Sequence, residues 1–150
     1  MANLEFKDIS ILGMAGAVPK NKIVNRNYTR YFDAEAVSEI VDKTGVEERR
    51  FTTEDQTAAD LCYAAAEKLI ADNQIDKSEI DILLFVSQTP DYRMPATSLT
   101  LQHRLSLAKS TAAFDINLGC SGFVYGLSLA YAYANMPGIN KVLLLDGETR

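Results

Sequence analysis

Residues 114–126 read FDINLGCSGFVYG, and this stretch decides the fold of the 150-residue chain. It begins in a short apolar run, ends in a run with helical character, and places Cys120 at the bend between them. A strand that ends in a tight turn and is followed at once by a helix is typical of α/β proteins. Gly119 and Gly122 flank the bend and allow the backbone to approach the sulfur closely. We therefore predict a strand over 112–116 and a helix over about 121–136.

Strand-like and helix-like segments alternate on both sides of this turn. Residues 82–86 and 141–145 are continuous apolar runs, typical of fully buried strands in a parallel sheet. One helix is predicted to begin at Thr57, which with Asp60 three residues later resembles a capping box, and another spans about 97–107. This alternation indicates an α/β fold with a mostly parallel sheet and right-handed crossovers.

The first third of the chain is less regular. Residues 6–14 alternate loosely between apolar and polar, which predicts a first strand. Asp33 is expected to cap a helix that runs toward Lys43 and ends at Gly45. Residues 47–52 are expected to form a short polar strand or hairpin arm.

The segment from residue 116 to residue 140, which contains Cys120, has no charged residue. Its length could span a bilayer, but it contains several polar residues and glycines and has no basic cluster at its flanks, so we interpret it as a soluble helix. A helix without a polar face must be covered on all sides, which a 150-residue α/β layer alone cannot do. We therefore expect residues 1–150 to be one half-domain, with a buried central helix and a second layer supplied by further chain or a partner subunit.

The overall composition excludes several functional classes. With 47% hydrophobic and 23% charged residues, the chain has the composition of a globular protein. A net charge of -5 gives no electrostatic reason to bind nucleic acid or an anionic membrane. Its two cysteines have no metal-binding spacing, so we expect reduced thiols, no metal and no cofactor. The N-terminal residues resemble no signal segment, and a cytoplasmic location is expected.

Cys120 is the candidate nucleophile. The N-terminus of a helix favours the thiolate by about 1 kcal/mol, which helps activation without completing it, so a base or charged partner is also required. The alternative is that Cys120 is a small buried residue at a crowded turn. Cys62 lies on the apolar face of its predicted helix and is expected in the core. His103 is expected to be a surface residue of an amphipathic helix.

Residues 115–123 resemble the active-site stretch of β-ketoacyl-acyl-carrier-protein synthase III, a member of the thiolase-like superfamily. The resemblance implies a thiolase-like half-domain in which Cys120 takes an acyl group from a primer. Malonyl-acyl-carrier protein would then lose carbon dioxide and attack the acyl-cysteine. The family's catalytic histidine and asparagine would lie beyond Arg150, so the chain alone is expected to be inactive. Further matching positions lie along the whole chain: 11–13, 43–46, Arg49, Thr57, 88–91 and Pro95.

The same resemblance implies two substrate-binding residues. Met94 matches a bulky position that reaches across a homodimer and limits the partner's acyl pocket, although ordinary loop packing would also explain it. Lys43 matches a cation near the phosphates of CoA, and its alternative is a solvated lysine at a helix end. Glu39 stands where well-studied members have a tryptophan that stacks on the adenine. An acyl group on a carrier protein is therefore an alternative donor to acyl-CoA.

Two rival functions remain on the sequence alone. One is an acyltransferase that keeps Cys120 but does not decarboxylate, and the other is an inactive dimerisation scaffold. Whichever of these functions the chain has, the uncharged helix and the unfinished sheet predict a dimer or larger species. The strand before Cys120 or the terminal strand would form its edge.

Overall fold

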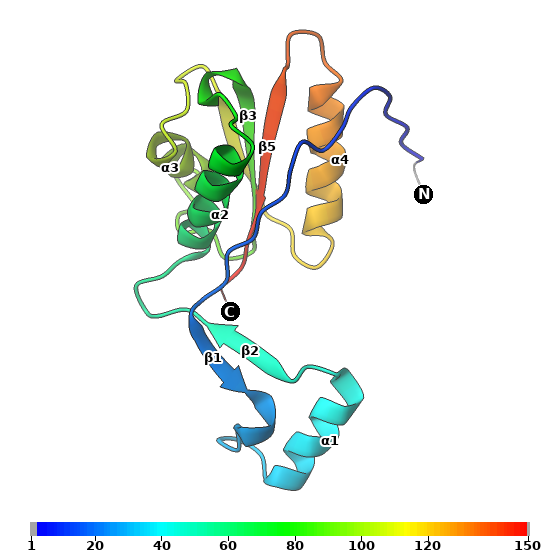
Figure 1. Cartoon of the computed structure of the whole chain (residues 1–150), viewed down its shortest axis with the longest axis vertical. Coiled ribbons are helices and arrows are strands. Elements are labelled where there is room, and N and C mark those ends of the chain that lie inside the picture. The colour runs from blue at the N-terminus through cyan, green and yellow to red at the C-terminus, as the bar shows by residue number, and fades with distance from the viewer. Residues whose placement is uncertain (1–2, 150) are drawn as a thin grey trace.

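The computed structural model describes residues 3–149, and its main body has three layers (Figure 1). A parallel sheet lies in the middle, with strand order β4-β3-β5. The strands are β3 (Ile80–Val86), β4 (Ala112–Ile116) and β5 (Lys141–Asp146). Helices α2 (Ala58–Asp72) and α3 (Thr97–Arg104) cover one face, and α4 (Gly122–Ala134) covers the other. The predicted α/β fold with a parallel sheet is confirmed.

The core lies between the sheet and helices α2 and α3. Leu83 and Phe85 of β3 are fully buried there, together with Leu101 of α3. Side chains cap the first turns of both α2 and α3. Thr57 and Asp60 form the predicted capping box at α2, because their side chains satisfy amide groups that the first helical turn leaves unpaired.

Helix α4 packs unusually close to the opposite face of the sheet. A Cβ atom on Gly122 would lie 2.7 Å from Val86 Cγ1, and one on Gly126 would lie 2.7 Å from Val86 Cγ2 and 3.0 Å from Leu144 Cδ1. The two glycines are four residues apart and therefore lie on one face of the helix. They form a seam, here called the glycine seam, along which the helix backbone meets β3 and β5.

The outer side of α4 differs from what the sequence predicts. Val124 is 67% exposed and Tyr125 58% exposed, so the helix is buried only along the glycine seam. The physical reason is that residues 3–149 supply only the extended N-terminal segment beside it, where the Phe6 and Tyr131 rings lie 5.6 Å apart. In the part of the chain that the structure describes, no helix is both long and apolar enough to cross a membrane.

A small arm extends from the main body (Figure 1). It contains β1 (Asn21–Val24), the short 3-10 helix η1 (Asn25–Asn27), α1 (Ala34–Thr44) and β2 (Glu48–Phe51). Strands β1 and β2 pair antiparallel, from Asn21 opposite Phe51 to Val24 opposite Glu48. Helix α1 begins after its predicted cap Asp33, which accepts a hydrogen bond from the Ala36 N–H, and ends at Gly45 with φ 69°.

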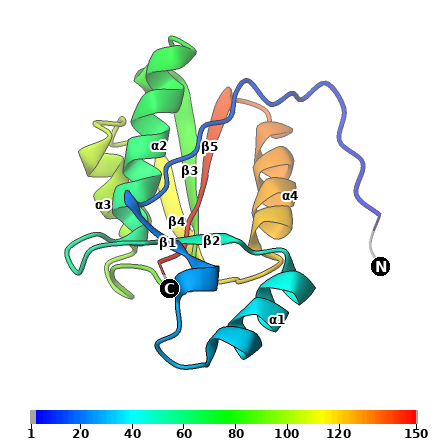
Figure 2. The same cartoon turned by 60° about the horizontal axis from the view of Figure 1, so that its bottom comes forward.

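Two sequence predictions about strands are wrong. Residues 6–14 form no strand but run as an extended segment past α4 and β5 (Figures 1 and 2). Between this segment, α2, α4 and the free edge of β5 lies a cavity of about 660 Å³. The segment makes no backbone pairing with β5, and the cavity lies between them. β5 is also not fully buried as predicted: Leu143 and Leu145 are buried in the core, whereas Val142 and Leu144 are only partly buried.

Candidate active site

Cys120 lies in the turn between β4 and α4, as predicted. The turn closes through a hydrogen bond from the Gly122 N–H to the Gly119 carbonyl oxygen, at 2.6 Å, and Ser121 is the residue at the N-cap of α4. The side chain of Cys120 is exposed, which contradicts the alternative of a buried apolar residue. The sulfur is therefore accessible and next to a helix N-terminus, where the unpaired amides favour negative charge.

Three loops meet at the carboxyl ends of the parallel strands. The Ser87 N–H donates to the Ile116 oxygen, and the Gly147 N–H donates to the Val86 oxygen, both at 3.1 Å. These bonds extend the register in which Val86 stands beside Ile116 and Asp146. Residues 87–89 and 147–149 consequently lie beside the nucleophile turn, defined here as residues 117–121. Ligands of open α/β sheets are typically bound at this end of the strands.

Gln88 and Glu148 join these loops, and the sequence analysis gave neither of them a role. The Gln88 N–H donates to Glu148 Oε1 at 2.5 Å, and the Thr89 hydroxyl donates to Glu148 Oε2 at 2.8 Å. The Gln88 side chain lies against Gly119, where an added Cβ would meet its Nε2 atom at 1.5 Å. Their position two residues after the ends of β3 and β5 was the available signal, because that position faces the ligand-binding end of the sheet.

The second thiol, Cys62, is buried in the core as predicted and lies against Gly147. Burial raises the pKa of the Cys62 thiol to about 12, and the negative charges of Asp146, Asp91 and Glu148 act in the same direction. Burial also raises the pKa of Asp146, with Glu148 contributing. Both effects disfavour the charged forms, so Cys62 is not a nucleophile at neutral pH.

The loop that contains Met94 is held by a carboxylate from the neighbouring strand. Asp115 of β4 accepts hydrogen bonds from the Thr97 and Ser98 N–H groups, both at 2.8 Å, and so caps α3 in place of a local side chain. Met94 itself is 90% exposed. The Met94 side chain therefore packs little against the residues that the structure describes.

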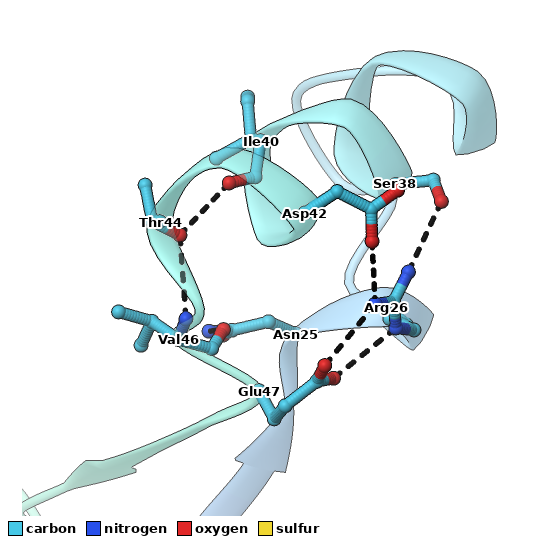
Figure 3. Close-up of polar contacts among 8 residues, drawn as sticks. All are labelled: Asn25, Arg26, Ser38, Ile40, Asp42, Thr44, Val46 and Glu47. Carbon is cyan, nitrogen blue, oxygen red and sulfur yellow. Dashed lines mark hydrogen bonds and ion pairs between the residues drawn. The ribbon is translucent and has the colours of Figure 1, made fainter.

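Lys43 lies on the arm, in the last turn of α1, and forms an ion pair with Glu39 at 2.7 Å. The arm is held by a polar network around Arg26, whose guanidinium contacts Asp42 at 2.7 Å and Glu47 at 3.1 Å (Figure 3). These carboxylates raise the pKa of Arg26, so it stays cationic. The structure does not bring Lys43 and Cys120 into contact through any hydrogen bond or ion pair of residues 3–149.

No histidine or metal-ligand cluster accompanies Cys120 in the described part of the chain. His103 is an exposed residue of α3, as predicted. Residues 3–149 contain no group of three or more histidine, cysteine or acidic side chains placed to hold a metal ion. The arrangement near Cys120 therefore consists of an accessible thiol, a helix N-terminus and the polar loop ends of β3 and β5.

Comparison with known proteins finds that the chain is similar to members of one family. Residues 114–150 match the family model of 3-oxoacyl-[acyl-carrier-protein] synthase III. The chain is 33% identical over 143 residues to the β-ketoacyl-[acyl-carrier-protein] synthase III of Fusobacterium nucleatum, covering 95% of this chain and 43% of the relative. It is 31% identical over 140 residues to the synthase III of Syntrophomonas wolfei, covering 93% of this chain and 42% of the relative.

A solved structure supports the same assignment. The 3-oxoacyl-(acyl-carrier protein) synthase of Burkholderia xenovorans superimposes with a TM-score of 0.82 at 42% identity, covering 87% of this chain and 38% of that chain. By fold the chain is a thiolase-like α/β half-domain. By sequence it corresponds to the N-terminal portion of a β-ketoacyl-[acyl-carrier-protein] synthase III, as residues 115–123 indicated. It spans about two fifths of the length of the curated relatives it matches.

Proposed function

We propose that the chain is the nucleophile-bearing part of a decarboxylating condensing enzyme that begins fatty-acid synthesis. The observation that supports this most is the position of Cys120. Its exposed sulfur lies at the carboxyl end of a parallel sheet and at a helix N-terminus, within the segment that matches the synthase III family. Access and thiolate stabilisation are the two requirements of a nucleophilic cysteine.

The proposed reaction has two bond-forming steps. First, the Cys120 thiolate attacks the thioester carbonyl of an acyl primer, and the carrier thiol leaves after taking up a proton. Second, malonyl-acyl-carrier protein loses its carboxylate as carbon dioxide. The electron pair left on carbon attacks the acyl-cysteine carbonyl, and the Cys120 thiolate leaves. Neither step requires a metal ion or a redox cofactor.

The backbone at the nucleophile turn supports the first step. Among residues 3–149, none accepts a hydrogen bond from the Cys120 N–H. This amide is therefore available to stabilise the oxyanion that forms when the thioester carbonyl is attacked. Removal of one such donor typically reduces turnover by about 10²- to 10³-fold.

Met94 and Lys43 are proposed to contact substrates. The exposed Met94 side chain would reach the acyl pocket of a second copy in a homodimer. Lys43 would meet the phosphates of the acyl donor, but Glu39 already neutralises its charge. Glu39 also offers no ring on which the adenine of CoA could stack, so acyl-carrier protein is proposed as an alternative donor to acyl-CoA. We place the enzyme in the cytoplasm, with malonyl-acyl-carrier protein as the second substrate.

The acylation step is tested in the chimera described in the next paragraph, because the chain alone lacks the base or charged partner that Cys120 requires. Incubation with acyl-CoA or acyl-carrier protein should add one acyl group, mapped to Cys120 by peptide mass analysis. The adduct should be absent from Cys120→Ser and retained by Cys62→Ala, the matched control for the second thiol. An adduct that persists in Cys120→Ser would disprove the assignment.

Condensation is tested in a chimera in which this chain replaces the matching part of the Burkholderia xenovorans synthase. Ketoacyl product from malonyl-acyl-carrier protein should then form at a typical enzymatic rate, about 1 per second or faster. The chain alone should form none. Acyl transfer without loss of carbon dioxide would instead identify a non-decarboxylating acyltransferase, and no adduct on Cys120 would identify an inactive scaffold.

A further inference from the structure

The contact between Gln88 and Gly119 links the end of β3 to the nucleophile turn. An added Cβ on Gly119 would lie 1.5 Å from Gln88 Nε2, 2.4 Å from Cδ and 3.2 Å from Oε1, and these are its three nearest atoms. In the described chain, the glycines with positive φ are Gly45 and Gly138. A side chain at residue 119 would therefore displace the Gln88 amide, which occupies its position.

Gln88 is itself held in place from the other side. Its N–H donates to Glu148 Oε1, and the other oxygen of that carboxylate accepts from the Thr89 hydroxyl. The Ser87 N–H, one residue earlier, donates to the Ile116 oxygen at the end of β4. The base of the Gln88 side chain is thus fixed to both neighbouring strand ends, and only its amide reaches the turn.

We infer that Gln88 is a positioning residue for the nucleophile. The amide lies against the backbone of Gly119, one residue before Cys120, and so determines where the sulfur lies relative to the N-terminus of α4. Glu148 transmits the position of β5 to the same point. This inference rests on the proposed function only in taking Cys120 as the nucleophile, and its test requires no acyl donor.

The test is a double-mutant cycle read out by iodoacetamide alkylation of Cys120 across pH in the 150-residue chain. Gln88→Ala should slow alkylation at pH 7 by about two- to five-fold, the range expected for weakened interaction with a helix N-terminus, and should move the profile to higher pH. Gly119→Ala should slow it similarly, because its Cβ displaces the flexible amide without unfolding the chain. When Gly119→Ala is combined with Gln88→Ala, it should slow alkylation little further, because the amide atoms that its Cβ would meet are absent.

Gln102→Ala is the matched control. Its amide donates to the Ala108 and Thr111 carbonyl oxygens at 2.8 and 2.9 Å, on the α3 side of the sheet. This variant should lower the unfolding temperature but leave the Cys120 profile unchanged. The inference is overturned if Gln88→Ala leaves the pH profile of Cys120 alkylation unchanged, or if Gln102→Ala shifts that profile equally. It is also overturned if the double variant slows alkylation by the product of the two single effects, since the residues would then act independently. Because alkylation is independent of acyl transfer, failure here is distinguishable from failure of the proposed function.

Discussion

At the scale of single residues, the chain contains two thiols in opposite environments. Cys120 is exposed in the turn before α4, whereas Cys62 is buried among α2, β5 and Gly147. The pKa of about 12 for Cys62 leaves about one molecule in ten thousand ionised at pH 8. Since only the thiolate reacts, the burial of Cys62 should make it react far more slowly than the exposed Cys120.

Iodoacetamide at pH 8 should therefore modify Cys120 alone in the folded chain. Peptide mass analysis over time measures the two rates, and in the chimera prior incubation with the acyl donor should protect Cys120. Unfolding in denaturant provides the control, because both cysteines should then react at similar rates. Equal rates in the folded chain would contradict the assignment of the nucleophile.

Asp60 gives a prediction about pH. Its carboxylate accepts a hydrogen bond from the Thr57 N–H at 3.0 Å and forms an ion pair with Arg104 at 2.8 Å. The amide hydrogen bond, and then the Arg104 contact, lower the pKa of Asp60 below its ordinary value. The stabilisation is therefore complete above about pH 4, the unfolded pKa, and is lost as pH falls through the lower folded value.

Asp60→Asn should reduce the free energy of unfolding by about 1 kcal/mol at pH 7, the usual effect of losing a helix cap. Urea denaturation at several pH values should show this difference shrinking below about pH 4, because the wild-type carboxyl is then protonated as well. Thr57→Ala, which removes the other half of the capping box, should lose stability at every pH. A constant difference for Asp60→Asn would contradict an electrostatic origin.

At the scale of elements, the helices and strands that could be predicted are those that residues nearby in the sequence specify. Both ends of α1 and the start of α2 were predicted within one or two residues, because Asp33, Gly45 and Thr57 specify them. The strands β3 and β5 were predicted from continuous apolar runs, and β4 from its place before the turn at Cys120. The strand predicted over residues 6–14 was wrong and β1 was not predicted, because pairing of an extended segment depends on a distant partner, which sequence alternation cannot identify. For the same reason the contact of Gln88 with Gly119, across two loops, had no local signal.

The glycine seam of α4 can be tested directly. Gly126→Ala gains about 1 kcal/mol of helix propensity but overpacks Val86 and Leu144, which costs about 1–3 kcal/mol in a closely packed site. The expected result is a net loss of up to about 2 kcal/mol in the free energy of unfolding, measured by urea denaturation. Gly16→Ala is the matched control, because its Cβ meets no atom within 4 Å. A stabilised Gly126→Ala would show that helix and sheet can separate without loss.

At the scale of the whole molecule, the main body has apolar surface on two sides. Strands β4 and β5 are the edges of the sheet, as predicted, and the outer side of α4 exposes Phe123, Val124 and Tyr125. Unpaired strand edges and contiguous apolar surface both promote association. The predicted dimer or larger species therefore has two candidate contact surfaces.

Val124→Glu should decrease self-association of the chain if the outer side of α4 is the contact. Val18→Glu is the matched control, because both valines are 67% exposed but Val18 lies on the N-terminal segment. Sedimentation velocity at micromolar concentration measures the species, and thermal unfolding verifies that both variants remain folded. A wild-type chain that sediments as a stable monomer would contradict the prediction of association.

The strand order β4-β3-β5 also affects the chain during its synthesis. β3 is the central strand, but its second neighbour, β5, begins about 55 residues after β3 ends. At about 5–20 residues per second, the ribosome needs roughly 3–11 s to produce them. Throughout that interval, one side of the most apolar strand has no partner, although β4 can already pair with the other side. A chaperone that binds extended apolar segments would therefore meet its best target in the nascent chain at residues 80–86, before the nucleophile turn has a sheet on which to form.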